Sequence, residues 1–488
     1  MRSSGFHNST GVPGPIQRIR NSQAVASLND FLRRPAYMIV LAVLTVICYL
    51  HEIDLISYTV FLLVAIYVAV FGDDLLPLVP LFMFCYIAPS HNNNPGSRWN
   101  PESIFYPRNG GYVIYTLLAI FVACLVIRLI RDPEIGGRRF VRTKRSLTSG
   151  MLFLGAAYLI GGFGIPEYAD VFVGHTVFAL AQFASVFLLY YLLTGGVKWD
   201  RVPKDYIAWV GLIVGFVVLP QLLENYLSGR VFLPGTHTID RERMFTGWGM
   251  HNNIGGMLAM MIPFPFYLAS RKERGWIYTV LATLLLVGAV LSCSRTSMIV
   301  AAMTYSVCVW LLLRDKQRRK QHLRVFQIFG AIILVFAVVF FRKLLDVFDL
   351  FLDELFQISQ RDNLFEYGMK QFFQHPILGG SFFPQGEYVP WTWISSGLGD
   401  FLPPRWHNTV VQVLASCGMV GMAAYSLHRL QTIRLFTKRP SVEKQYIVIY
   451  ICILLVLSLF DCHFFNVGPV LFYSMALAFA EKLEESKL

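Results

Sequence analysis

Apolar runs recur along the whole chain, separated by short polar segments that carry most of the charge. Many runs approach the roughly 20 residues that an α-helix needs to cross a bilayer. The pattern predicts an all-α, polytopic integral membrane bundle of about 12–14 spans, with the higher number favoured. Several runs are short, so neighbouring ones could be re-entrant or fused. The predicted spans are 36–50, 56–71, 74–89, 112–130, 147–164, 172–195, 206–222, 252–269, 276–293, 296–313, 325–341, 407–425, 445–461 and 467–481.

The composition agrees with a membrane protein, because 55% of the 488 residues are hydrophobic and 15% are charged. A soluble protein typically has about 25% charged residues. The net charge of +12 would suit a nucleic-acid partner, but most Lys and Arg residues lie in short segments between apolar runs. The positive-inside rule explains this placement and predicts cytoplasmic N- and C-termini in the inner membrane. We therefore expect a lipid bilayer, and no nucleic acid, as the surroundings of the chain.

The cysteine pattern and the N-terminal segment each argue against an alternative. The eight cysteines form no CxxC pair, so neither a disulfide framework nor a zinc site is indicated. Residues 1–35 are polar and carry Arg33 and Arg34 directly before the first apolar run. A cleavable signal peptide has a shorter charged head and a small-residue cleavage site. We interpret this segment as a cytoplasmic tail followed by an uncleaved first span.

The polar segments divide the chain into regions and define the predicted outer loops. Residues 90–111 and 342–406 are outer segments, and the second opens with RKLLDVFDLFLDELFQ. Its apolar residues recur at helical spacing opposite acidic ones, which predicts an amphipathic helix along the outer interface. Loops of this length are usually functional. The expected regions are a basic cytoplasmic tail at 1–35, membrane helices at 36–222, a core at 223–425 that includes outer loops 223–250 and 342–406, and the last membrane helices with a short tail at 426–488.

One predicted span opens with polar residues, because residues 405–421 read RWHNTVVQVLASCGMVG. In a continuous helix His407 and Gly418 are about three turns apart and share a face, with Gly421 close to it. Small residues on one face let a membrane helix pack closely. In the predicted topology His407 and Asn408 stand at the outer mouth of this helix. An isolated histidine at a helix start can also be a cap or a packing residue.

Arginines gather in the predicted outer segments beside this helix. Arg295, in SCSRTS, lies between two apolar runs at membrane depth, where a charge costs about 2.5–3.5 kcal/mol at the bilayer centre. Arg361 begins a segment with a helical pattern, and IDRERMF carries Arg241 and Arg243. Each has a plainer explanation: Arg295 could extend to the headgroups, Arg361 could be solvated, and the other two could balance neighbouring acidic residues.

The spacing HN-x9-G-x2-G at 407–421 resembles the signature of bacterial O-antigen ligases, whose wider family includes O-antigen and teichuronic-acid polymerases. The resemblance extends over roughly 240–425. The sequence departs from the family where Ser381 follows two glycines, because the family more often continues Gly-X-Gly. Three further segments are similar to family elements: MHNNIGGMLAMMIP at 250–263, SCSRTSMIV at 292–300 and RDNLFEYGMKQFFQHPILGG at 361–380.

The resemblance implies transfer of a glycan from undecaprenyl diphosphate to an acceptor sugar hydroxyl, outside the inner membrane. Histidine titrates near neutral pH, so His407 suits the general base that takes the hydroxyl proton, with Asn408 orienting substrate or imidazole. Negative charge builds on the leaving diphosphate, and the forked donors of arginine match phosphate oxygens. The candidate diphosphate-binding residues are Arg295 and Arg361, followed by Arg241 and Arg243.

Several alternatives to this interpretation remain open. The acceptor could be lipid A core, as for a ligase, or a second lipid-linked glycan, as for a polymerase, and these residues do not separate the two. A transporter of lipid-linked glycans would need charges inside several helices, whereas here the polar residues gather on one side. We expect no cofactor and no metal, because no metal-binding motif is present. Asp240 and Glu242 could nevertheless bind a divalent ion.

Overall fold

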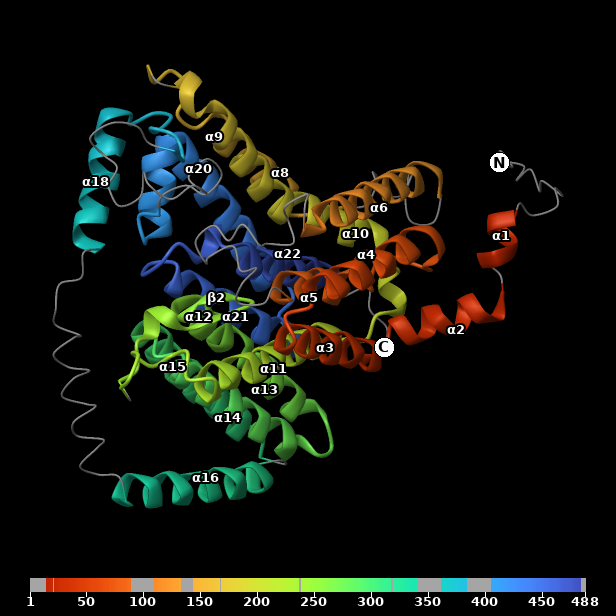
Figure 1. Ribbon diagram of the computed structural model, residues 1–488, viewed down its shortest axis with the longest axis vertical. Helices are drawn as coiled ribbons and strands as arrows, with labels where there is room; N and C mark the ends of the chain where they lie inside the picture. The colour runs from red at the N-terminus through yellow and green to blue at the C-terminus, as the bar shows by residue number, and fades with distance from the viewer. Residues whose placement is uncertain are drawn as a thin grey trace.

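The computed structural model describes residues 15–20, 22–88, 109–132, 144–166, 168–236, 238–316, 319–339, 361–383 and 405–483. Within these ranges the protein is a helix bundle, and its only strands are β1 (Phe245–Thr246) and β2 (Gly249–Met250), which pair antiparallel. The predicted all-α class is therefore confirmed. Figure 1 shows one packed body with α2 (Gln23–Leu32) and α16 (Arg319–Val339) at its edges. The amphipathic helix predicted at 342–357 lies outside the described residues.

Each predicted span coincides with a helix or with two consecutive helices. Proline begins α3 and α13, where its missing N–H has no helical partner to lose. A short π-helix, η3 (Ala184–Leu188), connects α9 to α10. The helices at the predicted spans are α3 (Pro35–Leu50), α4 (Asp54–Phe71), α5 (Leu78–Ile87), α6 (Gly111–Arg131), α8 (Thr148–Ile160), α9 (Tyr168–Phe183), α10 (Leu189–Gly196), α11 (Tyr206–Leu227), α12 (His251–Met261), α13 (Pro263–Arg271), α14 (Gly275–Leu291), α15 (Arg295–Arg314), α16, α20 (Thr409–Thr437), α21 (Val442–Leu457) and α22 (Val467–Lys482).

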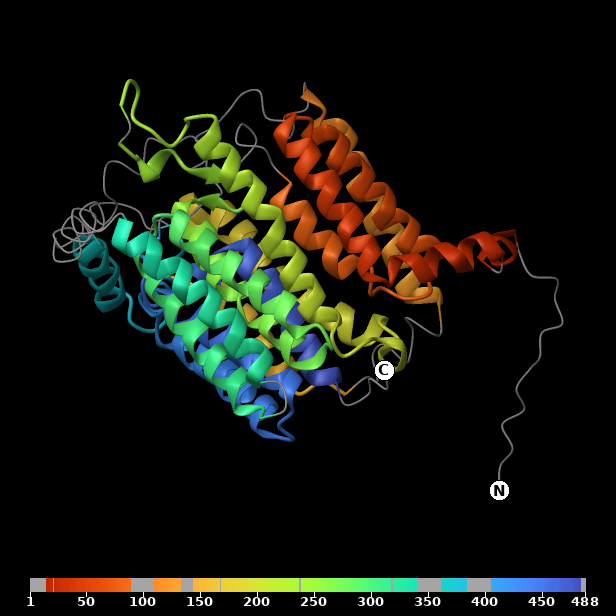
Figure 2. The same ribbon diagram turned by 90° about the horizontal axis from the view of Figure 1, so that it is seen from below.

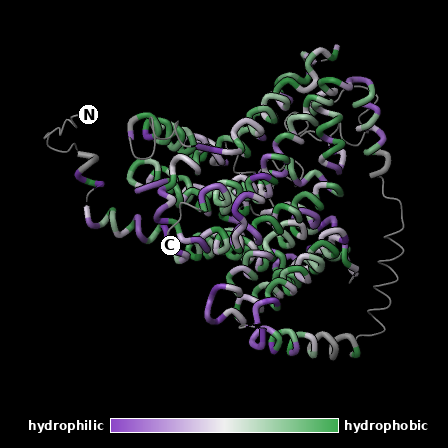
Figure 3. Tube along the Cα trace, turned by 180° about the vertical axis from the view of Figure 1, so that it is seen from behind, coloured by the Kyte–Doolittle hydropathy of each residue, from purple (hydrophilic) through white to green (hydrophobic). Residues whose placement is uncertain are grey.

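Not every predicted span is a full-length membrane helix. Among the described residues, 7 helices or joined helices are long and apolar enough to cross a membrane: α4, α6, α9 with α10, α11, α12 with α13, α15 and α20. α2 and α3 would add one more, but they meet at a bend of 74°. Others are shorter, such as α5 with 10 residues. Figure 3 shows hydrophobic residues along most helices and hydrophilic residues mainly at turns and ends, as expected for a multi-pass membrane protein.

The α12–α13 pair lies at the centre of the bundle. Its most apolar stretch is 89% buried, whereas that of α6 is 17% buried and faces outward. Figure 2 shows helices from both halves of the chain running side by side, with the loop that follows α11 projecting from one end. We call this the site end of the bundle; it comprises residues 228–253, 291–297, 405–409 and 458–467. The N-terminus of the central helix α12 therefore reaches the site end.

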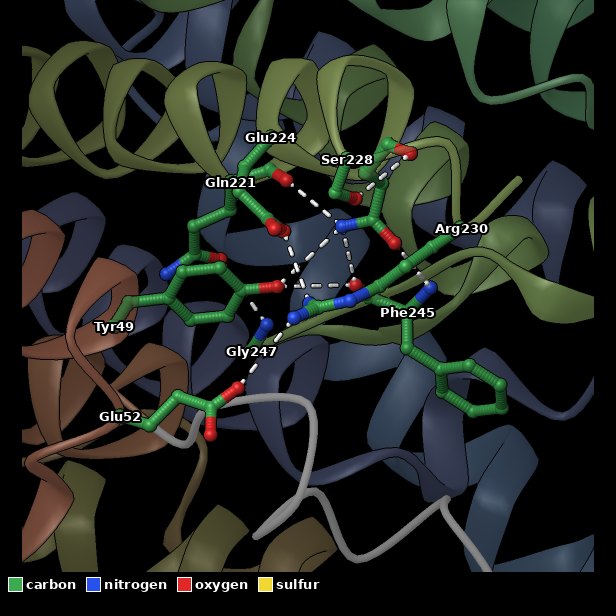
Figure 4. Close-up of polar contacts among 9 residues, drawn as sticks. Tyr49, Glu52, Gln221, Glu224, Ser228, Arg230, Phe245 and Gly247 are labelled. Carbon is green, nitrogen blue, oxygen red and sulfur yellow. Dashed lines mark hydrogen bonds and ion pairs between the residues drawn. The ribbon is translucent and has the colours of Figure 1, made fainter. Parts of the chain in front are cut away.

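Two amides of α11 hold the hairpin that leads into α12 (Figure 4). Gln221 Oε1 accepts a hydrogen bond from Gly247 N at 3.0 Å. Asn225 Nδ2 donates to the carbonyl oxygen of Phe245 at 2.8 Å, and its Oδ1 accepts from Phe245 N at 3.3 Å. The hydroxyl of Tyr49 donates to the same carbonyl at 3.1 Å. Because α12 follows β2 directly, these bonds fix where α12 begins.

α20 is interrupted at Gly418, where a loop enters the helix. Gly418 has φ 59° and ψ −157°, which is not helical. Met419 N donates to the carbonyl oxygen of Pro376 at 2.9 Å, and Gly380 N donates to that of Ala415 at 2.7 Å. The loop before Ser381 thus supplies backbone partners at the point where α20 loses its own. The continuous helix predicted over 407–425 is therefore corrected to two helical parts with a break between them.

Both predicted packing glycines stand at close approaches, but for different reasons. A Cβ at Gly418 would lie 2.4 Å from the carbonyl oxygen of Ile377, so its neighbour is loop backbone and not another helix. A Cβ at Gly421 would lie 2.3 Å from Cys417 Cβ, across the break in its own helix. The shared helical face inferred from their spacing does not exist, because His407 precedes the first residue of α20 and the break at Gly418 separates the first part of the helix from Gly421.

The residues after the inserted loop are anchored in the bundle. The hydroxyl of Ser381 donates to His175 Nδ1 at 2.9 Å, and Phe382 N donates to the same nitrogen at 3.2 Å. His175 Nε2 donates to the carbonyl oxygen of Tyr158 at 2.8 Å. The ring of Phe382 is buried, 5.6 Å from that of Phe465 between centroids. The loop is therefore attached to α8, to α9 and to the turn before α22.

The predicted orientation can be tested by labelling. We expect tags at 90–111 and 342–406 to react with reagents that cannot cross the inner membrane, because these segments hold few basic residues. Tags at 131–146 and 314–324 should be protected until the cells are opened. Thiol labelling of single cysteines in intact cells measures this. Reaction at the last two segments in intact cells would reverse the orientation and place the site end in the cytoplasm.

Candidate active site

His407 lies in a turn between a buried tryptophan and a helix cap. Trp406 is 1% exposed and packs with residues of α18 (Arg361–Gln374) and α20. Asn408 is the N-cap of α20, and its Oδ1 accepts from Val410 N at 2.8 Å and from Val411 N at 3.2 Å. His407 itself has φ 51°, in the left-handed region that residues with a Cβ seldom adopt. Its side chain is 29% exposed and so remains accessible.

The imidazole of His407 pairs with Asp461. Nδ1 lies 3.3 Å from Oδ1 of the carboxylate, whose side chain is 14% exposed. Burial alone would raise the pKa of Asp461, but the nearby His407 imidazole and the charges of His463 and Arg405 lower that pKa well below its usual range. Asp461 is therefore ionised at neutral pH. With Nδ1 beside a carboxylate, Nε2 is the nitrogen left to accept a proton.

The segment that carries His407 is fastened to the turn that carries Asp461. Asn408 Nδ2 donates to the carbonyl oxygen of Leu459 at 3.0 Å. Thr409 N donates to the carbonyl oxygen of Ser458 at 2.8 Å. Both ends of the Asn408 amide are thus used in positioning the backbone. The predicted role of Asn408 in orienting substrate remains a prediction, and its cap and its bond to Leu459 give it a structural role.

The start of α12 meets the serine-rich turn before α15. The hydroxyl of Ser294 donates to Asn252 Oδ1 at 2.9 Å, and its oxygen lies 2.9 Å from the hydroxyl oxygen of Ser297. A Cβ at Gly255 would lie 2.7 Å from Ser297 Cβ, so glycine allows the two helices to approach this closely. Arg295 is the first residue of α15. The predicted arginine therefore emerges beside the N-terminus of the central helix.

Asn466 joins these two parts of the site. Its Nδ2 donates to Asn253 Oδ1 at 2.9 Å, and its Oδ1 accepts from Arg405 Nη1. Arg405 precedes His407 by two residues. Asn253 directly follows Asn252, which accepts the hydrogen bond from Ser294. The segments that the sequence singles out at 250–263, 292–300 and 405–421 are therefore connected by side-chain hydrogen bonds at the site end.

Two predicted arginines lie on the loop that follows α11. Arg243, in the short turn η5 (Arg241–Arg243), donates through Nη1 to the carbonyl oxygen of Phe232 at 2.7 Å. Arg241 Nε lies 3.7 Å from Glu242 Oε1, as expected for a balanced charge. Glu242 Oε1 also lies 3.9 Å from Nε2 of His251, the first residue of α12. Arg241 and Arg243 are therefore near the start of α12, but these two contacts of theirs are made within the loop.

The remaining predicted positions are Arg361 and the acidic pair Asp240 and Glu242. Arg361 is the first residue of α18, and its side chain lies outside the described part of the structure. α18 ends at Gln374, two residues before Pro376, which cannot continue a helix. Asp240 Oδ1 accepts from Glu242 N at 3.1 Å and so caps η5. Within the described ranges, no three His, Cys, Asp or Glu side chains are grouped closely enough to hold a metal ion.

Sequence reasoning did not single out Asp461, Asn466 or Asn253. The first two lie in DCHFFN, a polar interruption between the last two apolar runs. The sequence did contain a signal for them, because the DCHFFN turn falls on the same predicted side of the membrane as His407. It was weak, since a polar turn between two spans is ordinary.

The fold and the site together define the class of the protein: a multi-pass, all-α membrane protein with a histidine–aspartate pair in a polar cluster at one end of the bundle. Residues 280–426 match the family of O-antigen ligases. The match contains Arg295, the 361–380 segment and the whole HN-x9-G-x2-G spacing, and it supports an O-antigen ligase-like family. It also supports a role in glycan transfer, of the ligase or the polymerase kind, with a lipid-linked glycan and an acceptor as partners. No curated protein matches the chain.

Proposed function

We propose that the protein transfers a glycan from undecaprenyl diphosphate to a sugar hydroxyl at the outer face of the cytoplasmic membrane. The observation that carries this proposal is the pairing of His407 with Asp461 at 3.3 Å, inside a polar cluster formed by the family-like segments. A histidine paired with a carboxylate through one nitrogen is arranged to accept a proton at the other. The lipid bilayer delivers the donor to the level of the site end.

The reaction follows from this arrangement. The acceptor hydroxyl attacks the anomeric carbon and forms a new carbon–oxygen bond, while its proton passes to Nε2 of His407. The bond from the anomeric carbon to the diphosphate breaks, and undecaprenyl diphosphate leaves with the electron pair. Asp461 keeps the imidazole oriented and stabilises the imidazolium that forms. The released diphosphate or water then takes the proton, so that the histidine returns to its neutral form.

Arginine supports departure of the diphosphate. Arg295 stands at the start of α15, beside the α12 N-terminus, and the positive end of a helix dipole favours a phosphate there. Arg361 is the second proposed residue, on the strength of the sequence alone. Arg241 and Arg243 are proposed as secondary contacts, because η5 is near the start of α12. A diphosphate is already a good leaving group, so no protonating acid is required.

The proposal is tested with the full-length protein in proteoliposomes that contain a labelled undecaprenyl-diphosphate oligosaccharide. We expect label to appear in a new glycosidic product. Transfer that requires added lipid A core identifies a ligase, and longer lipid-linked glycan without that acceptor identifies a polymerase. Movement of unchanged donor across the bilayer without a new bond would contradict the proposal and indicate a transporter.

A further inference from the structure

Arg405 has surroundings that suit a ligand-binding residue. Its guanidinium is half-buried and donates through Nη1 to Oδ1 of Asn466, which is an uncharged acceptor. Within the part of the chain that the structure describes, Arg405 forms no ion pair with a carboxylate inside 4 Å. Asp461 is near enough for Arg405 to lower its pKa, yet it pairs with His407. Among the described residues, the positive charge of Arg405 is therefore not paired with a carboxylate.

Another arginine at the same end of the bundle is different. Arg230 lies 3.1 Å from Glu224 Oε2 and 3.4 Å from Glu52 Oε1 (Figure 4). Two carboxylates neutralise its charge, as expected for a residue that stabilises the protein and binds no anion. The contrast matters because both side chains are partly exposed and both carry the same group. Arg405 is held in place by an amide, whereas Arg230 is neutralised by acids.

The amide that holds Arg405 is itself fixed. Asn466 is 4% exposed, and its Nδ2 lies 2.9 Å from Asn253 Oδ1 and 3.4 Å from His463 Nδ1. With its nitrogen engaged there, its oxygen faces Arg405. An amide oxygen orients the guanidinium but leaves its charge available for an anionic ligand. A guanidinium held this way loses less conformational entropy when a phosphate binds.

We propose that Arg405 binds the diphosphate of the lipid-linked donor, together with Arg295 and across the N-terminus of α12. This inference rests on the proposed function and adds a residue to its donor site. Arg405 and Arg295 are connected through Asn466, Asn253, Asn252 and Ser294, so both sit on the same rigid frame. Each phosphate of the donor carries a negative charge, and each arginine offers forked donors to one phosphate. His407, two residues from Arg405, is then next to the anomeric carbon attached to that diphosphate.

The test measures binding of undecaprenyl diphosphate to the purified full-length protein in detergent. Arg405→Gln should weaken binding about 10- to 100-fold, the size expected for a lost charge-assisted contact. Arg405→Lys should recover only part of it, since a point charge replaces the fork. Asn466→Asp should weaken binding similarly, because a carboxylate at that position would neutralise Arg405. Arg230→Gln is the matched control and should bind like the wild type.

The outcomes separate this inference from the proposed function. If the wild type does not bind undecaprenyl diphosphate, the proposed function fails, and the assignment of Arg405 fails with it. If the wild type binds and Arg405→Gln binds equally well, only the assignment of Arg405 is overturned. A loss of affinity for lipid A core instead would move Arg405 to the acceptor. Should Arg405→Gln not fold, Asn466→Asp decides alone, and donor binding equal to the wild type there overturns the assignment.

Discussion

Replacing His407 with alanine is expected to slow glycan transfer by about 10²- to 10⁴-fold, the usual contribution of a general base. The imidazole is 29% exposed and paired with Asp461, so it is both reachable and oriented. Donor binding should persist, because arginines are proposed to hold the diphosphate. The measurement is the transfer rate of labelled donor glycan in proteoliposomes, with binding of undecaprenyl diphosphate followed separately.

Two further variants make this result specific. His51→Ala removes an exposed histidine that follows α3 and should leave the rate unchanged. Asp461→Asn should slow transfer less than His407→Ala, since the imidazole remains but loses its carboxylate. The double variant should be no slower than His407→Ala, because both residues act in one unit. A loss of only a few-fold in His407→Ala would make the histidine structural, and a parallel loss of donor binding would make it a positioning group.

The helices and the main site segment could be predicted from the sequence because both signals are local. Apolar runs of nearly membrane length gave helices at every predicted span, and the HN-x9-G-x2-G spacing pointed to His407. Lengths were less predictable. α5 is a 10-residue helix inside a longer apolar stretch, and most of its side chains are buried against neighbouring helices.

The partners of His407 could not be predicted from local pattern. Asp461 and Asn466 lie in a turn distant in the sequence, and only the packing of α20 against the last two helices brings them to the site. Arg405 was visible beside His407, but its significance depends on its uncharged partner. Sequence shows which residues are polar; it does not show which charges are neutralised.

The break in α20 was also hidden, because the residues around Gly418 have a helical, apolar pattern. Their backbone partners come instead from the loop at 376–380, more than thirty positions earlier in the chain. A glycine that permits helix packing and a glycine that permits a loop to enter a helix look alike in a sequence. The geometry of Gly418 separates them, and it leads to a second large expected effect.

Gly418→Ala is expected to destabilise the protein and to reduce transfer strongly. Its φ of 59° and ψ of −157° belong to a region that is essentially restricted to glycine, where strain for other residues is about 1–3 kcal/mol. The new Cβ would in addition lie 2.4 Å from the carbonyl oxygen of Ile377 and 2.7 Å from Gly379 N. That backbone cannot retreat easily, because Val420 N donates to the same carbonyl oxygen at 3.2 Å. The loop must leave the break, and the helix start that carries His407 then loses its support.

Gly229→Ala separates the two contributions. Gly229 also has a positive φ, 74°, but a Cβ there would meet nothing within 4 Å. It should therefore show backbone strain alone, while Gly418→Ala shows strain together with loss of the docked loop. Thermal unfolding in detergent and the transfer rate are measured for both variants. We expect a clearly larger fall in the apparent Tm for Gly418→Ala, and a large loss of transfer for that variant only. Equal effects of the two substitutions would mean that the loop tolerates a side chain at Gly418, so that its insertion does not hold the His407 segment in place.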